Sequence, residues 1–560
     1  MLTKSQFAEK RASHRSAAAG CSRIVLHGSD PVDALSPFPD LARCLGYLPG
    51  TRSVLRCCET WASPMLCSRR NNEGGPFQDP HTCRQLNLVS RYMRTLLYPL
   101  LALGLFGADW PQLRGPNGSG LCPSCGQLPT QFGPQKNVLW KTELPAGKSS
   151  PVLVGDRIFL TASEGDDLIT MCLSRATGKV QWRRSLRATR REAQNTLNHR
   201  AAPTAVTDGK SVFVFFGDFG LLAYDFEGKQ RWQLPLGPFN SQHGLVASPI
   251  YADGRVVLVC DQDTDAYIIA VDADSGKIAW KTPRHVINGY STPAIYRPAR
   301  GPAQIIAPGS YQLTAYSIVD GEPLWFVRGL TCQPKSAPTI TGDIVYFNGW
   351  TIGNDAGEQV ELPTFAEVIA SADANHDGKL SQIEVPQAWQ PTGTWRAIDL
   401  DRDGFLNERE WTFFRTRRSS RNGLLAVKLG GSGDVTDTHV LWRFEKSLPD
   451  VPTPLVYKDV VFLVRSGGIA TTLDAQTGKV LKQARLTGAL EDYYASPIGV
   501  DGKVYIASEH GKVVVLRAVG DWEILAINEF DSDIYATPAI SEGKMYIRTQ
   551  NDIYAIGSPN

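Results

Sequence analysis

Short apolar runs separated by turns repeat along the chain from residue 149 onward. Each repeat begins with a small residue followed by proline, continues through three short apolar runs, and often ends with a glycine-containing turn and a tryptophan. Short runs of apolar or alternating character, bounded by turn residues, are typical of β-strands. The pattern therefore predicts an all-β protein built from one repeated unit.

Eight pairs of a small residue and a proline mark the starts of the repeats. The pairs are Ser150-Pro151, Ala202-Pro203, Ser248-Pro249, Thr292-Pro293, Ala337-Pro338, Thr453-Pro454, Ser496-Pro497 and Thr537-Pro538. Successive prolines lie 52, 46, 44, 45, 116, 43 and 41 residues apart. A period of about 45 residues with about four strands in each unit is typical of β-propeller blades. The eight anchors therefore predict an eight-bladed propeller.

The two ends of the repeat region complement each other. The last unit has apolar runs at Lys544–Thr549 and Asp552–Ile556, and the sequence then stops without an outer strand. Residues 137–141, by contrast, have the pattern of an outer strand that belongs to no blade. Because a closed ring leaves no sheet edge exposed, we expect this N-terminal strand to complete the eighth blade.

The turn that ends the third repeat carries a distinctive motif, Ala-Val-Asp-Ala-Asp-Ser-Gly-Lys-Ile-Ala-Trp at residues 270–280. It resembles the tryptophan-docking motif of the pyrroloquinoline-quinone (PQQ) repeat family, which includes quinoprotein alcohol dehydrogenases and the propeller lipoprotein of outer-membrane assembly. The resemblance covers roughly residues 109–560, and the opening at 109–118 looks like the start of exported PQQ-like proteins from environmental bacteria. We interpret the repeated tryptophans as packing between neighbouring blades.

One spacing departs from the others and indicates an insertion in the fifth blade. The 116 residues between Pro338 and Pro454 exceed the usual period by about 71 (116 − 45), and the surplus falls at residues 351–421. We therefore expect blades 1 to 4 and the first part of blade 5 within residues 109–350, and the remainder of blade 5 with blades 6 to 8 within residues 422–560.

Two segments of the insertion match the calcium loop of an EF-hand. Such a loop offers side-chain oxygens at positions 1, 3, 5 and 12, a backbone carbonyl at position 7, and a group that often acts through water at position 9. The expected ligands are Asp373, Asn375, Asp377, Lys379, Ser381 and Glu384 in the first loop and Asp399, Asp401, Asp403, Phe405, Asn407 and Glu410 in the second. Leu380 and Leu406, at position 8, are expected to pair the loops. The sequence predicts a small α-helical insertion that binds calcium as its cofactor.

The connection between the two loops is short. Residues 385–398 number 14 and include Pro386, Pro391 and Gly393, so the helices between the loops must be short. We expect an affinity of about 10⁻⁴–10⁻³ M, as in extracellular modules. Calcium would then act as a stabilising clamp rather than as a trigger that opens a sensor.

The first 108 residues show no repeat. Residues 1–92 hold six of the eleven cysteines and follow no strand or helix period, whereas residues 93–108 have a basic start and an apolar core. That pattern is typical of a secretory signal peptide. We expect residues 1–92 to be a misassigned or disordered extension and the mature chain, with no transmembrane segment, to be exported to the periplasm or the extracellular space. The alternative is a disordered tail before a buried apolar segment.

Export would permit disulfides. Cys122 and Cys125 are spaced to close a small disulfide or to form half of a zinc site, although no second Cys or His pair stands near them.

Composition and cysteine placement bear on function. The formal net charge is +2 in 560 residues, which gives no basic excess for binding nucleic acid.

In the family that the chain resembles, the quinone stacks on tryptophan and on a disulfide between adjacent cysteines. The only adjacent cysteines here, Cys57 and Cys58, lie outside the predicted propeller, and neither a haem motif nor the family's Glu–Asn–Asp set can be matched. The resemblance thus supports the fold more than redox chemistry, and PQQ is a cofactor that the site residues do not support.

The residues just before each inner strand should converge at one mouth of the channel. They are Asn198, His199, Arg200, Gln242, His243, Asn288, Tyr290, Gln333, Lys335, Glu491, Asp492, Tyr493, Tyr494, Asp533 and Tyr535. The candidates selected for a ligand surface are His199, Arg200, His243, Asn288, Tyr290, Lys335, Asp492 and Tyr493, with an unknown protein, peptide or carbohydrate as the ligand. The alternative is a set of strand-entry residues capped by water and neighbours.

The leading functional hypothesis is an exported calcium-binding propeller that acts as a binding or scaffold protein, and the sequence leans away from an enzyme. The first alternative is a PQQ-dependent dehydrogenase of alcohols or sugars. The second is an outer-membrane assembly factor.

Overall fold

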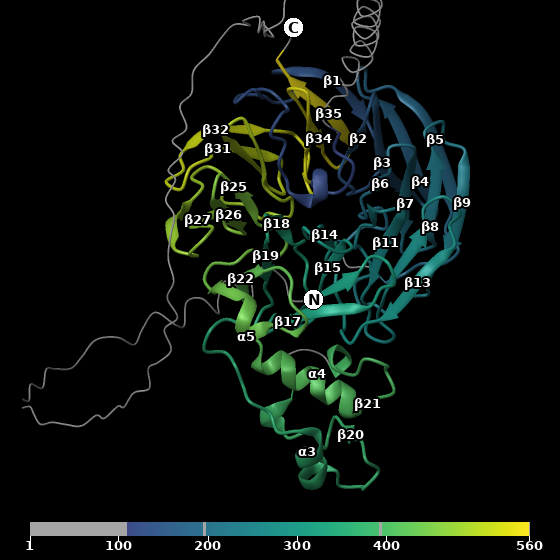
Figure 1. The fold of residues 1–560 in the computed structure, drawn as a ribbon, viewed down its shortest axis with the longest axis vertical. Helices are drawn as coiled ribbons and strands as arrows, with labels where there is room; N and C mark the ends of the chain where they lie inside the picture. The colour runs from purple at the N-terminus through teal and green to yellow at the C-terminus, as the bar shows by residue number, and fades with distance from the viewer. Residues whose placement is uncertain (1–108, 194–197, 391–394, 559–560) are drawn as a thin grey trace, which may run out of the picture. The chain divides into compact units, whose positions relative to one another are not determined.

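The repeats fold into eight antiparallel sheets that follow one another around a ring (Figure 1). The computed structural model describes residues 109–193, 198–390 and 395–558. The expectations for residues 1–92 and for a signal peptide at 93–108 lie outside these ranges. The short first strands of successive blades contact one another around the channel. The prediction of an all-β, eight-bladed propeller is confirmed.

The first four blades come directly from the first four repeats. Blade 1 consists of β2 (Val152–Val154), β3 (Arg157–Glu164), β4 (Asp167–Ser174) and β5 (Val180–Arg187). Blade 2 consists of β6 (Val206–Thr207), β7 (Ser211–Phe216), β8 (Gly220–Asp225) and β9 (Gln230–Pro235). Blade 3 consists of β10 (Ile250–Ala252), β11 (Arg255–Cys260), β12 (Tyr267–Asp272) and β13 (Ile278–Pro283). Blade 4 consists of β14 (Ala294–Tyr296), β15 (Gln304–Gly309), β16 (Gln312–Ser317) and β17 (Pro323–Arg328).

The last four blades include the interrupted one and the one that closes the ring. Blade 5 consists of β18 (Thr339–Thr341), β19 (Ile344–Gly349), β22 (Gly423–Lys428) and β24 (Val440–Phe444). Blade 6 consists of β25 (Leu455–Tyr457), β26 (Val460–Arg465), β27 (Ile469–Asp474) and β28 (Val480–Arg485). Blade 7 consists of β29 (Ile498–Val500), β30 (Lys503–Ala507), β31 (Lys512–Arg517) and β32 (Ile524–Glu529). Blade 8 consists of β33 (Ala539–Ser541), β34 (Lys544–Arg548), β35 (Asp552–Gly557) and β1 (Val138–Glu143).

The burial of each strand follows from its place in the blade. Middle strands are covered on both faces by neighbouring blades, so every residue of β7 is buried and its sequence is almost wholly apolar. Outer strands face solvent on one side, and β1 accordingly alternates between exposed and half-buried residues. This alternation explains why polar residues flank the tryptophan in these outer strands.

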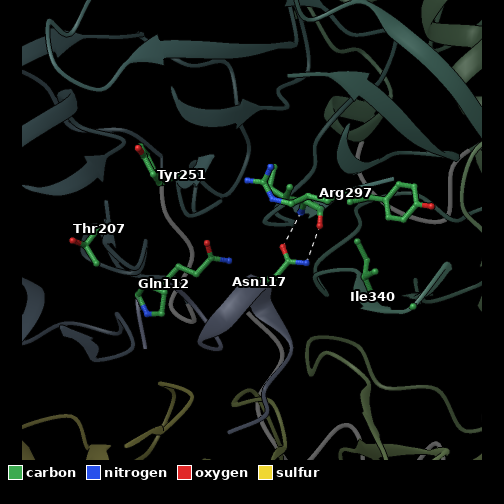
Figure 2. A pocket seen from close by; sticks show the side chains of 10 residues that line it. Gln112, Asn117, Thr207, Tyr251, Arg297 and Ile340 are labelled. Atoms are coloured by element: carbon green, nitrogen blue, oxygen red, sulfur yellow. Dashed lines mark hydrogen bonds between the residues drawn. The ribbon is translucent and has the colours of Figure 1, made fainter. Parts of the chain in front are cut away.

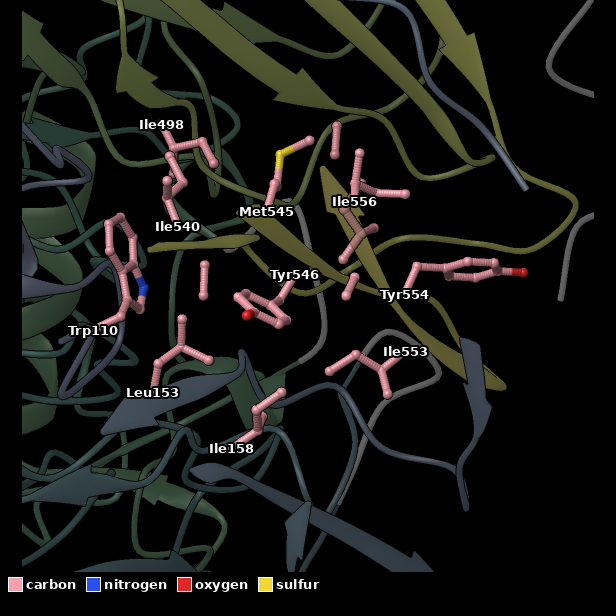
Figure 3. Close-up of a cluster of buried hydrophobic side chains, with 14 of the residues drawn as sticks. Trp110, Leu153, Ile158, Ile498, Ile540, Met545, Tyr546, Ile553, Tyr554 and Ile556 are labelled. Atoms are coloured by element: carbon pink, nitrogen blue, oxygen red, sulfur yellow. The ribbon is translucent and has the colours of Figure 1, made fainter. Parts of the chain in front are cut away.

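Strand β1 closes the ring as the sequence predicted. It pairs antiparallel with β35, with Trp140 opposite Ala555 and Thr142 opposite Ile553. Figure 3 shows the apolar cluster at this junction, where side chains of blade 1 meet those of blade 8. Trp110, fully buried, lies in the same cluster, and its backbone pairs with Leu153 of blade 1.

Tryptophans join neighbouring blades as interpreted from the motif. Five of them donate the indole N–H to a carbonyl in a turn of the next blade. The pairs are Trp140 with Arg175 (3.1 Å), Trp182 with Phe226 (2.8 Å), Trp232 with Ala273 (2.8 Å), Trp280 with Ile318 (3.1 Å) and Trp442 with Ala475 (3.1 Å). Trp325 departs from the rule and donates to Gln304 of its own blade at 2.9 Å.

The segment between β19 and β22 forms the insertion. It contains α3 (Phe365–Ala372), β20 (Leu380–Ser381), the 3-10 turns Gln387–Trp389 and Trp395–Ala397, β21 (Phe405–Leu406) and α4 (Glu408–Ser419). Figure 1 shows α3 and α4 together at one side of the ring. The insertion has its own apolar core, which includes Val368, Leu380, Leu406 and Trp411.

Two further short elements follow β22. Strand β23 (Gly433–Asp434) pairs in parallel with β17 and adds a fifth strand to blade 4, and α5 (Thr436–His439) lies next to it in the chain. Within the described ranges, no helix combines the length and the apolar character needed to cross a membrane.

A segment before β1 crosses the ends of the inner strands. It includes a short 3-10 turn (Pro116–Gly118) and the disulfide between Cys122 and Cys125. Arg114 is fully buried and donates to the carbonyls of Pro454 and Pro497, both at 3.2 Å. Burial lowers the pKa of Arg114 to about 9. This segment therefore ties blades 6 and 7 to the start of the ring.

Candidate functional site

The first calcium-type loop folds around its own carboxylates. Asp373, at position 1, accepts hydrogen bonds from the backbone N–H groups of Asp377 (3.2 Å) and Gly378 (2.9 Å). Glu384, at position 12, accepts from the backbone of Ala374 (3.1 Å). These bonds fix the carboxylates at positions 1 and 12, two of the side-chain ligand positions of a calcium loop, against the backbone of the same loop.

The second loop brings three carboxylates together. Oxygens of Asp399, Asp401 and Asp403 lie within 4.8 Å of one another. Glu410, buried at position 12, accepts from the backbone N–H groups of Leu400 (2.6 Å) and Asp401 (3.1 Å). Oδ1 of Asp399 is buried and has no hydrogen-bond partner. A buried carboxylate oxygen is stable only when it is paired or coordinates a metal, so the donor set fits a hard divalent cation.

The two loops are joined to each other and to their helices. Leu380 pairs with Leu406 through the two-stranded sheet of β20 and β21, as the shared loop position predicted. Nζ of Lys379 donates to Asp403 across the loops at 2.7 Å. The side chain of Asn407 caps α4 by accepting from the backbone of Glu410 at 3.1 Å. The acidic positions are therefore held in place by ordinary capping and strand contacts.

A pocket of about 330 Å³ opens among the loops that precede the inner strands, at one mouth of the channel. Its lining consists of Lys148, Asn198, Ala202, His243, Val246, Tyr290, Gln333, Lys335, Asp450, Val451, Tyr494 and Tyr535. The rings of Tyr494 and Tyr535 lie 5.5 Å apart, and Nζ of Lys148 lies 3.5 Å from the centre of the Tyr535 ring. Nζ of Lys335 pairs with Asp450 at 2.5 Å. The lining thus offers flat aromatic surfaces beside ammonium groups, which suits a polar ligand with a flat face.

Burial shifts the titration of the pocket groups. Burial and the nearby Lys335 lower the pKa of His243. Burial, followed by the charges of Glu509 and Asp492, raises the pKa of Tyr494 to about 12. At neutral pH the tyrosine keeps its hydroxyl proton, and His243 is more often neutral than an exposed histidine.

Three of the eight ligand-surface candidates line this pocket, namely His243, Tyr290 and Lys335. Others make contacts within the protein. Arg200 pairs with Asp218 at 2.7 Å, and the buried Tyr493 donates its hydroxyl to the carbonyl of Ala489 at 2.6 Å.

The remaining candidates also have local roles. Asn288 donates to the carboxylate of Asp263. His199 accepts from the backbone of Ala201 at 3.1 Å, and the carbonyl of Asp492 accepts from the backbone of Glu509 at 2.8 Å.

Lys148 and Asp450 line the pocket but are not among the residues that the sequence predicts at the channel mouth. Both lie within three residues of an anchor pair, Lys148 before Ser150-Pro151 and Asp450 before Thr453-Pro454. The residues before the inner strands of blades 1 and 6 could have been predicted in the same way, because each inner strand starts at the same mouth.

A second cavity, of about 380 Å³, lies where the inner strands end (Figure 2). Asn117 of the N-terminal segment reaches across it and bonds both the N–H (2.9 Å) and the C=O (2.8 Å) of Ile295. Arg297, also in the lining, pairs with Asp253 at 2.9 Å. The N-terminal segment therefore covers this end, and the side chains of Asn117 and Arg297 are engaged by the protein itself.

Comparisons with known proteins agree with the architecture. The chain is 28% identical over 169 residues to a polyvinylalcohol dehydrogenase from a Pseudomonas species, a match that covers 27% of this chain and 25% of the relative. The chain thus spans about a quarter of the length of the curated relative that it matches.

One solved structure shows the same fold at low identity, and a second gives a lower TM-score. A quinohemoprotein alcohol dehydrogenase from Pseudomonas putida HK5 superposes with a TM-score of 0.50 and 13% identity, covering 81% of each chain. BamB from Moraxella catarrhalis gives a TM-score of 0.48 and 12% identity, over 75% of this chain and 98% of the other.

The strand repeat, the tryptophans between blades and the closure by β1 together describe a PQQ-type propeller. The family model PQQ_2, described as outer membrane protein assembly factor BamB, matches residues 133–294, 239–328 and 431–558. These matches together span more than half of the chain, and the protein therefore belongs to the PQQ_2 family of β-propellers.

Proposed function

We propose that this protein is an exported calcium-binding propeller that acts as a binding or scaffold protein through the mouth of its channel. The observation that carries the proposal is the second loop, where three carboxylates converge and Oδ1 of the buried Asp399 has no partner in the protein. Asp399, Asp401, Asp403 and Glu410 would hold the ion there, with Asp373, Asn375, Asp377 and Glu384 in the first loop. The ion would supply charge neutralisation that closes each loop.

Titration calorimetry of the folded chain with calcium tests this proposal. We expect binding near 10⁻⁴–10⁻³ M, as in extracellular modules. A variant carrying both Asp373→Asn and Asp399→Asn changes position 1 of each loop and should lose the heat of binding. Absence of binding by the unmodified, folded chain at millimolar calcium would refute the calcium assignment.

The pocket at the mouth supports the binding role. It combines three tyrosines with Lys148, Lys335 and hydrogen-bonding side chains in one cavity of about 330 Å³. Such a lining can take a carbohydrate ring or the side chains of a peptide. A glycan array and a peptide library, each read with the unmodified chain and with Tyr535→Ala, would identify the ligand class.

A PQQ-dependent dehydrogenase is the second candidate, and the similarity to a polyvinylalcohol dehydrogenase favours it. The pocket fits the quinone with its metal poorly. Its described lining contains neither tryptophan nor a pair of cysteines, and its one carboxylate, Asp450, is already paired with Lys335. The direct test is to incubate the protein with PQQ and calcium and to assay alcohols and sugars with an artificial electron acceptor.

An assembly factor at the outer membrane is a further candidate, because the matching family model carries that description. Co-purification with outer-membrane proteins from the native cell would favour it. Sequencing the N-terminus of the native protein tests export, and a mature end before residue 93 would contradict the proposed signal peptide.

A further inference from the structure

The two calcium-type loops have different surroundings, because only the second faces the propeller in the described part of the insertion. Leu400, at position 2 of that loop, is buried among Ile287, Tyr311 and Cys332 from blades 3 to 5 and their connections. It lies between two of the expected ligands, Asp399 and Asp401. The loop residues that do not face the ion therefore form the contact with the propeller.

One amide of the propeller contacts this loop twice. Nδ2 of Asn240 donates to the carbonyl of Leu400 at 2.9 Å, and Oδ1 of Asn240 accepts from Arg402 at 2.8 Å. The backbone of Asn240 is itself fixed, since its N–H donates to Gln262 at 2.7 Å and its carbonyl accepts from the N–H of Asp263 at 2.8 Å. Asn240 thus holds positions 2 and 4 of the loop on blade 3.

Helix α4, which follows the second loop, extends the contact. Arg409 donates to the backbone carbonyl of Asp263 at 3.0 Å. The ring of Phe413 stacks on Tyr311, with centroids 6.1 Å apart, and the Tyr311 hydroxyl donates to the Phe413 carbonyl at 3.2 Å. The second loop and its helix therefore form one continuous docking surface.

The first loop makes its contacts within the insertion. Asp373 and Glu384 accept hydrogen bonds from backbone N–H groups of the same loop, and Glu384 also accepts from the Ser381 hydroxyl at 2.6 Å. Lys379 reaches Asp403 of the second loop, and Leu380 pairs with Leu406. The conformation of the second loop therefore affects the contact with the propeller, whereas that of the first loop affects only the insertion.

We propose that calcium in the second loop clamps the insertion onto the propeller, whereas calcium in the first loop does not; the proposal rests on the calcium binding proposed above. Without an ion, the clustered carboxylates of Asp399, Asp401 and Asp403 repel one another and open the loop. An ion closes it and holds Leu400 and Arg402 in the docked position. Because linkage is reciprocal, docking also raises the affinity of the second loop for calcium.

The clamp is connected to the pocket at the channel mouth. Asn240 lies three residues before His243, which lines the pocket, and the intervening Ser241 donates to Asn288 at 3.4 Å. The carbonyl of His243 accepts from Asn198, another lining residue, at 2.7 Å. Calcium in the second loop therefore stabilises one wall of the pocket.

Hydrogen–deuterium exchange of the full chain, with and without calcium, tests the clamp through a matched pair of variants. Asp373 and Asp399 occupy position 1 of their loops, are 7% and 6% exposed, and accept from the glycine N–H at position 6 at 2.9 and 3.1 Å. We expect calcium to slow exchange at residues 236–246 in the unmodified chain and in Asp373→Asn. In Asp399→Asn it should leave that exchange fast.

A propeller variant tests the same coupling from the other side. Asn240→Ala leaves every expected calcium ligand intact. We expect it to weaken binding at the second loop about tenfold, within the usual range of coupling between sites, and to leave the first loop unchanged. This variant also decides the matter if Asp399→Asn fails to fold.

The outcomes separate the clamp from calcium binding itself. If the unmodified chain binds calcium but exchange at residues 236–246 does not respond, the clamp is refuted and the calcium proposal stands. Equal responses of the two position-1 variants, or unchanged calcium affinity in Asn240→Ala, would also refute it. If the folded chain binds no calcium, both proposals fail together.

Discussion

The turn at Gly276 provides a quantitative test of how tryptophans hold the blades together. Gly276 has a φ of +71°, and a Cβ added there would lie 2.7 Å from the Trp232 ring. That ring is 8% exposed and donates to the carbonyl of Ala273 at 2.8 Å. Gly276→Ala should therefore strain the backbone and displace the Trp232 indole from its contact with the turn.

The expected loss of unfolding free energy has two parts. A left-handed conformation costs a non-glycine residue about 1 kcal/mol. Displacing Trp232 forfeits a hydrogen bond of about 1 kcal/mol and part of the roughly 3–5 kcal/mol that a buried tryptophan contributes. We expect a total of about 3–4 kcal/mol for Gly276→Ala.

Gly254→Ala is the matched control, because Gly254 has a φ of +77° and no atom within 4 Å of the added Cβ. It should cost about 1 kcal/mol, for the backbone alone. Urea denaturation followed by far-ultraviolet circular dichroism measures both variants. The double variant Trp232→Ala/Gly276→Ala has no clash between the added Cβ and the indole. Its loss of unfolding free energy should therefore be smaller than the sum of the losses in the two single variants. Equal losses in the two glycine variants would refute the docking argument.

Three further predictions concern buried polar groups and the disulfide. Arg284 and Asp261 form a fully buried pair at 2.7 Å, so Arg284→Met alone should lower the unfolding free energy by about 3–5 kcal/mol; denaturant titration should show a smaller loss when Asp261→Asn is added. Replacing Cys122 and Cys125 by serine opens a very small loop and should cost about 2 kcal/mol, and a reducing agent should then have no further effect on the urea midpoint. Burial, and next the charge of Arg548, lowers the pKa of His199 to about 4, so the folded state favours the neutral ring. Its stabilisation is complete above pH 6.5 and falls by up to about 3 kcal/mol as the pH drops toward 4; His199→Asn should flatten that part of the stability curve, and an unchanged acid slope would contradict the assignment.

The architecture was predictable because each blade repeats the same local signals. A proline marks the entry of each inner strand, where a missing N–H costs least, and β1 pairs with β35 because the last repeat lacks an outer strand. The sequence shows that the outer strand of blade 6 has Leu481 near the position where other outer strands have tryptophan. Only the structure shows what Leu481 contacts. A Cβ on Gly520 of the next blade would lie 2.6 Å from Leu481, so leucine takes the place of the indole.

Contacts between distant segments could not be predicted from the repeat. Trp325 has no turn of the usual form beside it, because the segment after β22 forms β23 and pairs in parallel with β17. Asn240 and Leu400 are 160 residues apart and belong to different repeats. Asn240 lies in no motif, and the calcium-loop motif does not specify the residue at position 2, so their contact depends on how the insertion folds back onto blade 3.

The two ends of the channel differ, and the difference bears on where a ligand enters. At one end the N-terminal segment crosses the inner strands, with Arg114 and Asn117 bonded to backbone groups of several blades. At the other end the lining of the pocket comes from separate loops, one of which the second calcium-type loop holds through Asn240. An inserted domain that touched only the covered end would have no effect on ligand access. Because this insertion docks beside the open mouth, calcium binding and ligand binding are expected to depend on each other.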